Sequence, residues 1–234
     1  ILRAMEYHLL RTTQYNLGIL HLEEDTTRVV QGIATYELGI PAHLPDSNVS
    51  VEDILDAYES ATRRDDRVHI FTHFGSDDPD SILERVRFLA SACDCKFIFF
   101  DHISIVVSGL DDDNERKKLD YLSTRLKMLA KELGFCLVLV SHVNDDGKTR
   151  GSRNISKVCD LRIDLSRDNV ALNDHERNTT HLLVSKNRFA GKTGSAGKLF
   201  YDSVSGKLLN METASDDGTP PNTPVDDKSS KYAF

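Results

Sequence analysis

The sequence predicts an α/β fold in which a mostly parallel central sheet is flanked by helices and followed by antiparallel strands. The first observation is Phe97–Val107, an apolar run rich in β-branched and aromatic residues that is typical of a central strand buried on both faces. The second is the alternation of apolar strands with amphipathic helices up to residue 140. The third is a series of short strands separated by turns after residue 160. Asp101 is expected at the carboxyl end of the central strand, where open α/β sheets bind their ligands.

Length and composition fit one main domain. The chain has 234 residues, 39% of them apolar and 28% charged, which is ordinary for a soluble protein with a full core. Because no apolar run approaches the roughly 20 residues that cross a bilayer, a cytoplasmic protein is expected. The four cysteines lack the spacing of a zinc ribbon or a redox dithiol and are expected to be reduced core residues. A net charge of −8 argues against a nucleic-acid binder that uses its whole surface, but allows a local basic loop.

Ahead of the central strand, helices and strands alternate. The expected elements are a helix within 1–16, a strand over 17–22, a helix over 28–38, a loop and helix within 46–64, a strand over 68–71 and a helix from Asp78. Asp25 or Thr26 can cap the second helix, which is expected to end near Gly39. Asp78 followed by proline is a typical helix start.

Beyond the central strand, a parallel βαβ unit leads into hairpin-like antiparallel strands that are expected to extend the central sheet. The expected elements are a loop over 108–114, a helix over 119–133 stopped by Gly134, a strand over 135–140, a basic loop over 141–160, and strands over 161–165, 180–185 and 198–201, with turns at 168–178 and 191–197. We expect one domain over 1–210 and a disordered acidic tail over 211–234, because the tail has almost nothing to bury.

Polar residues follow four of the apolar strands. They are Glu23-Glu24, Asp101-His102, Ser141-His142 and Lys186-Asn-Arg188. In a parallel sheet the first three pairs gather at one carboxyl edge. That edge would then hold what a nucleoside triphosphatase needs, namely an acid for magnesium, a carboxylate that orients water, a γ-phosphate sensor and cationic groups. Each group alone also fits a turn, a cap or a solvated charge, so their order along the chain is what favours the enzyme.

With these motifs the chain resembles the ring-shaped DnaB-like replicative helicases, most closely the phage primase-helicases of the gene-4 type. The resemblance covers about residues 1–210 and is densest in Phe99–Ser108, Glu115–Lys117, Ser141-His142, Arg150–Ser152 and Lys186–Gly194. It implies a RecA-like core and an NTP-driven helicase that moves 5′-to-3′ on single-stranded DNA as a hexameric ring. Mg²⁺ and ATP or another NTP or dNTP are the implied cofactors, and a phage origin implies action in a bacterial cytoplasm.

The resemblance also implies roles for residues at the sheet edge. Asp101 corresponds to the Walker B acid that holds hydrated magnesium, and Glu23 to the carboxylate that activates the attacking water. His142 corresponds to the histidine that senses the γ-phosphate.

Three cationic residues complete the implied nucleotide site. Arg188 resembles the arginine finger that reaches into the site of a neighbouring subunit, with Lys186 beside it. Arg167 is expected to contact the nucleotide as well. A planar, permanently charged guanidinium suits the charge that spreads over a transferring phosphoryl group.

Two further segments are implied to bind macromolecules. Lys148, Arg150 and Arg153 resemble the central-channel loop that grips the phosphate backbone of single-stranded DNA, although an exposed hydrophilic connection is the ordinary alternative. The acidic tail ends on Phe234, and the resemblance implies that this aromatic residue docks on the replicative DNA polymerase. A tail that only improves solubility is the alternative.

The chain departs from the family pattern at the phosphate-binding loop. The pattern Gly-x-x-x-x-Gly-Lys-Ser/Thr is absent. Two segments match its second half, Gly147-Lys-Thr149 and Gly191-Lys-Thr193. The position of the first glycine is occupied by His142 in the former and by Lys186 in the latter. We therefore expect a fragment truncated within its first β-loop-α unit, one that by itself binds nucleotide weakly or not at all and hydrolyses little.

Two other functions stay open at this point. One is a RecA-like recombinase-type ATPase, which Lys186-Asn-Arg188 with its glycine-rich turn makes less favourable. The other is a non-catalytic RecA-like module for DNA binding or assembly that has no phosphate-binding loop. A Gly-x-x-x-x-Gly-Lys-Ser/Thr motif in the coding region upstream of Ile1 would favour the enzyme over the module.

Overall fold

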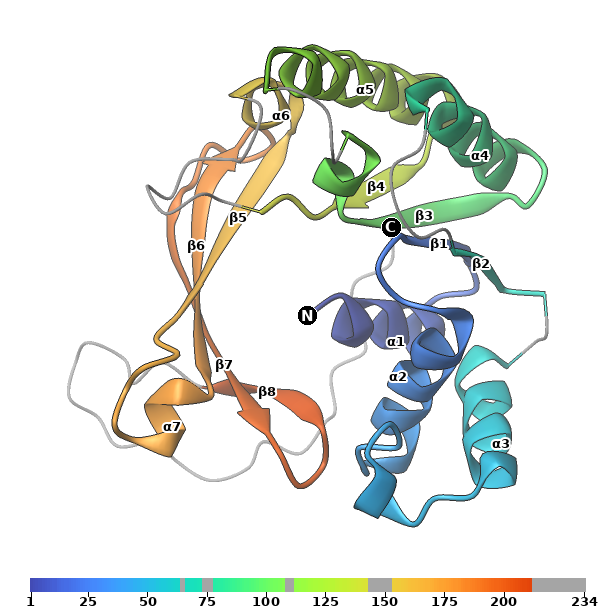
Figure 1. Cartoon of the computed structure of the whole chain (residues 1–234), viewed down its shortest axis with the longest axis vertical. Coiled ribbons are helices and arrows are strands. Elements are labelled where there is room, and N and C mark those ends of the chain that lie inside the picture. Colours follow the sequence, from blue (N-terminus) through green and yellow to red (C-terminus); the bar gives the residue numbers. More distant parts are fainter. Residues whose placement is uncertain (64–65, 73–77, 108–111, 143–152, 212–234) are drawn as a thin grey trace.

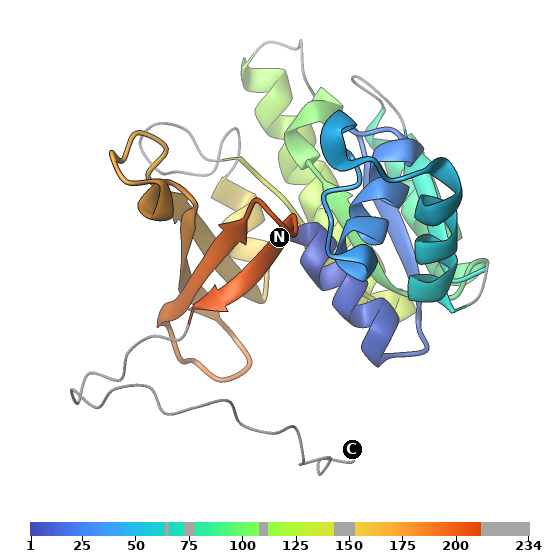
Figure 2. The ribbon, with the colours of Figure 1, turned by 90° about the horizontal axis from the view of Figure 1, so that it is seen from below.

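The described part of the chain contains two four-stranded sheets, and most of its helices pack around the first of them (Figure 1). The computed structural model describes residues 1–63, 66–72, 78–107, 112–142 and 153–211. Viewed from below, the second sheet stands beside the layered first unit, and the N-terminus lies between the two (Figure 2). The predicted α/β class with a parallel central sheet and antiparallel C-terminal strands is confirmed. The antiparallel strands, which were expected to extend the central sheet, instead form a sheet of their own.

The first sheet is fully parallel. Its strands are Asn16–His21 (β1), Val68–Thr72 (β2), Cys95–Asp101 (β3) and Cys136–Leu139 (β4), in the order β2-β1-β3-β4. The inner strands β1 and β3 are buried on both faces, with Ile19, Phe99 and Phe100 fully shielded from solvent. This burial explains their continuous apolar sequences, because neither face meets water.

Helices cover both faces of the parallel sheet (Figure 1). One side carries Leu2–Thr12 (α1), Thr26–Leu38 (α2) and Val51–Thr62 (α3), with a short 3₁₀ helix at Pro45–Ser47; the other carries Pro79–Ser91 (α4) and Asp112–Leu133 (α5). Of the two caps proposed for α2, Asp25 is the one used, since it accepts a hydrogen bond from the Arg28 amide. Gly39 ends α2 in the left-handed conformation, and Asp78 caps α4. None of the described helices is long and apolar enough to cross a membrane.

The central strand is shorter than its apolar run. β3 ends at Asp101, as expected for the acid, but Ile103–Val107 forms a buried 3₁₀ helix (η2), so the prediction of a strand to Val107 was wrong. A run that is apolar on every side fits a buried helical turn as well as a buried strand. The Ile103 amide donates to the Val140 carbonyl, which turns the chain across the end of β4.

The second sheet is antiparallel, and its strands follow one another in chain order. Its strands are Leu161–Arg167 (β5), Thr179–Asn187 (β6), Gly194–Asp202 (β7) and Lys207–Met211 (β8). The strand β8 was not predicted, and Met211, the expected first residue of the tail, ends it. The remainder of the expected tail, residues 212–234, lies outside the described residues.

Three local expectations after residue 140 need correction. The short helix Arg153–Val158 (α6) lies within the segment predicted as a loop, and Asp174–Arg177 (α7) within a predicted turn. The strand β7 begins at Gly194, inside the other predicted turn. Helices of one or two turns have too few residues for a periodic pattern, which explains why both were missed. All four cysteines are free as predicted, but of the four only Cys95 is buried in the core. Cys93 and Cys159 are half-buried, and Cys136, at the start of the edge strand β4, is exposed.

Candidate functional site

Backbone hydrogen bonds join the carboxyl ends of three neighbouring parallel strands. The Leu22 amide donates to the Asp101 carbonyl at 2.8 Å, which ties the end of β1 to the end of β3. The Val140 amide donates to the Phe100 carbonyl at 2.9 Å, and the Ile103 amide to the Val140 carbonyl at 3.2 Å. The residues that follow these strands are therefore held next to one another, as the parallel order predicted.

Glu23, His102 and His142 form a cluster at this edge. Nε2 of His102 lies 3.1 Å from Oε1 of Glu23, and the rings of His102 and His142 meet edge to face with their centroids 4.1 Å apart. One ligand atom from each residue lies within 4.8 Å of the other two. Imidazole and carboxylate donors could hold a transition metal, whereas Mg²⁺ prefers oxygen ligands. Sequence reasoning assigned no role to His102; the only local signal was its place directly after Asp101.

Asp101 itself is the last residue of β3 and is half-buried. It pairs with His21 across the β1–β3 ladder, and its backbone carbonyl is the acceptor that Leu22 uses. Its carboxylate offers the oxygen ligands that suit magnesium.

The adjacent glutamate, Glu24, belongs to a buried charge network instead. Glu24 pairs with Arg3 and with Nδ1 of His21 at 3.2 Å, while Nε2 of His21 lies 3.3 Å from a carboxylate oxygen of the fully buried Glu6. The hydrogen bond from His21, together with Arg3, lowers the pKa of Glu24 to about 2. Burial lowers the pKa of His21, but its hydrogen bonds to Glu24 and Glu6 outweigh burial and leave that pKa raised. Glu24 is thus committed to structure, whereas Glu23 is exposed.

A cleft of about 800 Å³ opens beside Glu23, between α1 and α2 on one side and the antiparallel sheet on the other. Its charged lining includes Arg3, Glu23, Glu24, Arg28 and Arg167. Arg167, at the end of β5, is oriented by hydrogen bonds to the Arg177 carbonyl and, at 3.0 Å, to Oδ1 of Asn178. The structure therefore brings two sequence-predicted residues, Glu23 and Arg167, to the same cleft.

Lys186 and Arg188 lie elsewhere, beside the C-terminal end of α6. Nζ of Lys186 donates to the carbonyls of Ser156 and Lys157 at 2.7 and 2.8 Å, and Nη2 of Arg188 donates to Lys157 at 2.7 Å. Cations at the last carbonyls of a helix satisfy orphan acceptors and complement the helix dipole. Lys186 is six residues along β6 from Thr180, which lines the cleft, so about 20 Å of strand separates them.

The predicted macromolecule-binding residues are largely beyond what the structure describes. Lys148, Arg150 and Phe234 lie outside the described residues. Arg153 is the first residue of α6.

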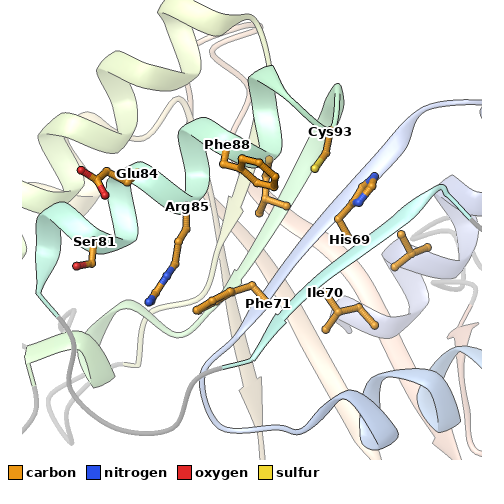
Figure 3. Close-up of a pocket in the computed structure, with 10 residues that line it drawn as sticks. His69, Ile70, Phe71, Ser81, Glu84, Arg85, Phe88 and Cys93 are labelled. Atoms are coloured by element: carbon orange, nitrogen blue, oxygen red, sulfur yellow. The ribbon is translucent and has the colours of Figure 1, made fainter.

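A second cavity, of about 640 Å³, lies on the outer edge of the parallel sheet between β2 and α4 (Figure 3). The Arg85 guanidinium stacks over the Phe71 ring at 4.0 Å from its centroid, and Phe88, another lining residue, is 61% exposed. None of the residues predicted to act on a nucleotide lines this cavity, so the candidate site is the cleft beside Glu23.

Comparison with known proteins finds a helicase family model and a helicase relative. The model of the DnaB-like helicase C-terminal domain matches residues 2–206. A DNA helicase/primase of Enterobacteria phage T3 is 28% identical over 206 residues, covering 82% of this chain and 36% of that protein. The chain thus spans about a third of the length of this curated relative.

Two solved structures share the fold. A DnaB-like replicative helicase, determined in a study of its interactions with primase, superposes with a TM-score of 0.64 at 16% identity, covering 85% of this chain and 51% of that one. A KaiC-like protein from Pyrococcus horikoshii superposes with a TM-score of 0.61 at 15% identity, covering 88% of this chain and 80% of that one. These likenesses confirm the predicted RecA-like fold class. Since the family model covers most of its length, the chain belongs to the family of DnaB-like helicase C-terminal domains.

Proposed function

We propose that this chain is the motor domain of a replicative DNA helicase that hydrolyses an NTP to move 5′-to-3′ along single-stranded DNA as a hexameric ring. The observation that carries the proposal is that Glu23 belongs both to the strand-end cluster and to the lining of the cleft. Its carboxylate contacts His102 in the strand-end cluster, and the same residue lines the 800 Å³ cleft. A carboxylate that lines a cleft and contacts a histidine at the strand-end edge suits attack of water on a phosphoanhydride.

The proposed roles come from the family resemblance, and position and chemistry are compatible with them. Glu23 orients the attacking water, and His142, edge-on to His102, senses the γ-phosphate. Asp101, a half-buried carboxylate at the end of β3, would hold hydrated Mg²⁺, which neutralises developing phosphate charge when bound. The nucleotide, ATP or another NTP or dNTP, would lie in the cleft and meet Arg167 there.

The finger residues are proposed to serve a neighbouring subunit. Lys186 and Arg188 are held at α6, about 20 Å of strand away from the cleft. A finger that far from its own cleft can complete a site only in another copy, and a closed ring supplies one copy per site.

The remaining partners are proposed from the family resemblance. Lys148, Arg150 and Arg153 grip the DNA backbone, and the tail ending in Phe234 docks on the replicative polymerase. We place this activity in the cytoplasm of a phage-infected bacterium.

A kinetic comparison tests the proposal. In the ring-forming protein, Glu23→Gln should lower kcat for DNA-stimulated NTP hydrolysis by about 10²- to 10⁴-fold and abolish unwinding, because the amide cannot accept a proton from water. Nucleotide affinity should persist. Glu176→Gln, at an exposed glutamate on α7, is the matched control and should retain wild-type rates. Wild-type kcat in Glu23→Gln would refute the role, and hydrolysis without unwinding in the wild type would favour the recombinase-type ATPase.

A further inference from the structure

His102 sits where three strand ends meet, and its backbone is held on both sides. The preceding carbonyl, of Asp101, accepts from Leu22, and the following amide, of Ile103, donates to Val140. The His102 carbonyl accepts from Ile105 at 3.2 Å. The residue is only 8% exposed, so both its backbone and its ring have little freedom. A side chain fixed in this way can fix its neighbours.

The contact between His102 and Glu23 has a defined direction. An ionised carboxylate only accepts hydrogen bonds, so Nε2–H of His102 is the donor to Oε1 of Glu23 at 3.1 Å. Nδ1 of His102 is buried and has no hydrogen-bond partner among the described residues. A proton on Nδ1 would lack an acceptor there, which favours the tautomer with its proton on Nε2.

Glu23 needs such a partner because its side chain is half exposed. The exposed fraction is 51%, against 10% for the His102 ring. A free glutamate samples many rotamers, and holding it costs side-chain entropy of up to about 2 kcal/mol. The hydrogen bond from His102 restrains Oε1 and leaves Oε2 available for water.

The same ring contacts His142. The two imidazoles meet at 83°, with the edge of one against the face of the other. If His142 moves, its ring displaces or releases the His102 ring, which in turn holds Glu23. The three side chains form a continuous path from His142, after β4, through His102, between β3 and η2, to Glu23 in the loop after β1.

We propose that His102 is a positioning residue, which orients Glu23 toward the attacking water and couples that orientation to His142. The inference rests on the proposed function, because it takes Glu23 as the group that activates water. It assigns His102 no direct contact with the nucleotide.

The test compares two substitutions that differ in a single property. His102→Leu removes the donor and retains an apolar side chain, whereas His102→Gln supplies an amide N–H near the position of Nε2. His102→Leu should lower kcat by about 10- to 100-fold with KM for the NTP unchanged, because a misplaced catalytic group slows the reaction without weakening binding. His102→Gln should recover most of the loss. His181→Leu, at an exposed histidine on β6, is the matched control.

A double variant separates this inference from the proposed function. If His102 acts through Glu23, then Glu23→Gln/His102→Leu is no slower than Glu23→Gln alone, since the two substitutions are not additive. Wild-type kcat in His102→Leu, alongside an inactive Glu23→Gln, would overturn the inference and leave the proposed function intact. Equal losses in His102→Leu and His102→Gln, with matching losses of thermal stability, would also overturn it.

Discussion

At the scale of single residues, Arg67 joins segments that lie far apart in the sequence. Its side chain is fully buried and donates to the carbonyls of Leu10, Thr13, Tyr15 and Thr62 at 2.9 to 3.1 Å. These acceptors belong to the end of α1, the approach to β1 and the end of α3. A guanidinium with several donors satisfies carbonyls that helix ends leave unpaired.

Replacing Arg67 should therefore destabilise the fold. Arg67→Met keeps much of the side-chain volume but leaves four backbone carbonyls without their donor, two of them in fully buried hydrogen bonds, so the free energy of unfolding should fall by about 3 to 5 kcal/mol. Urea denaturation measures the change. Arg125→Met, at an exposed arginine on α5, should stay within about 0.5 kcal/mol of wild type. Similar midpoints for the two variants would contradict the assigned role of Arg67.

The network around Glu24 predicts a bell-shaped dependence of stability on pH. The pKa of Glu24 is lowered from 4.5 to about 2, so its contribution is present above pH 4.5 and is lost as the pH falls toward 2. The pKa of His21 is raised from 6.5, so its contribution is complete below pH 6.5 and is lost at higher pH. Both contributions are therefore complete only between about pH 4.5 and 6.5.

Glu24→Gln tests this window. Its loss of stability should be largest between about pH 4.5 and 6.5 and should shrink on either side. We expect a maximum of about 1 kcal/mol, because Glu24 is half exposed and solvent screens its charge. Denaturation midpoints of the two proteins across pH 3 to 9 measure the difference, and a pH-independent difference would contradict the charge network.

At the scale of elements, helix starts follow the capping residues in the sequence. Asp25 and Asp78 cap α2 and α4, and Ser50 with Asp53 forms a capping box at α3. The Asp53 amide donates to Oγ of Ser50 at 3.0 Å. Such caps act within one turn, which is why the sequence alone indicated the starts of α2 and α4, whereas the box at α3 was not predicted.

The cap of α3 can be tested with two substitutions. Ser50→Ala should destabilise the protein by about 1 kcal/mol, because alanine removes the acceptor for the Asp53 amide. Ser50→Gly should cost only about 0.3 kcal/mol, since glycine leaves the helix end open to water. Thermal or urea unfolding ranks the two, and equal losses would show that the cap contributes no specific hydrogen-bond energy.

At the scale of the whole molecule, the residues of the proposed site divide between two places. Glu23 and Arg167 line the cleft, whereas Lys186 and Arg188 lie beside α6. If Arg188 acts in a neighbour's site, rings mixed from Glu23→Gln and Arg188→Ala subunits should regain hydrolysis that neither variant shows alone. About one interface in four then combines an intact Glu23 with an intact Arg188. Mixed rings as inactive as the two parents would contradict action in a neighbouring site.

The proposed DNA loop predicts a change in salt dependence. Replacing Lys148 and Arg150 by alanine in the ring should weaken single-stranded DNA binding and reduce the slope of log K against log salt by about 1.4, because two phosphate contacts are lost. Fluorescence anisotropy over a salt series measures the slope. Lys198→Ala, at an exposed lysine on β7, should leave it unchanged. An unaltered slope in the double variant would refute the assignment.

The sequence by itself determined the parallel sheet, the starts of α2 and α4 and the meeting of three strand ends. The first two depend on short-range signals, namely apolar periodicity and capping side chains. The third follows from the general rule that parallel strands share a carboxyl edge. Such signals also located Asp101 at the end of β3, although they could not distinguish the 3₁₀ helix Ile103–Val107 from a continuing strand.

Only the tertiary structure decided which side chains meet at that edge. Glu23 and His102 are 79 positions apart, and no local pattern indicates that they share a hydrogen bond. The same holds for Arg67, which bonds to carbonyls more than 50 positions away. It also holds for Lys186 and Arg188, which the antiparallel register directs to α6 rather than to the cluster. Strand register and packing set these long-range contacts, and both emerge only when the whole chain is folded.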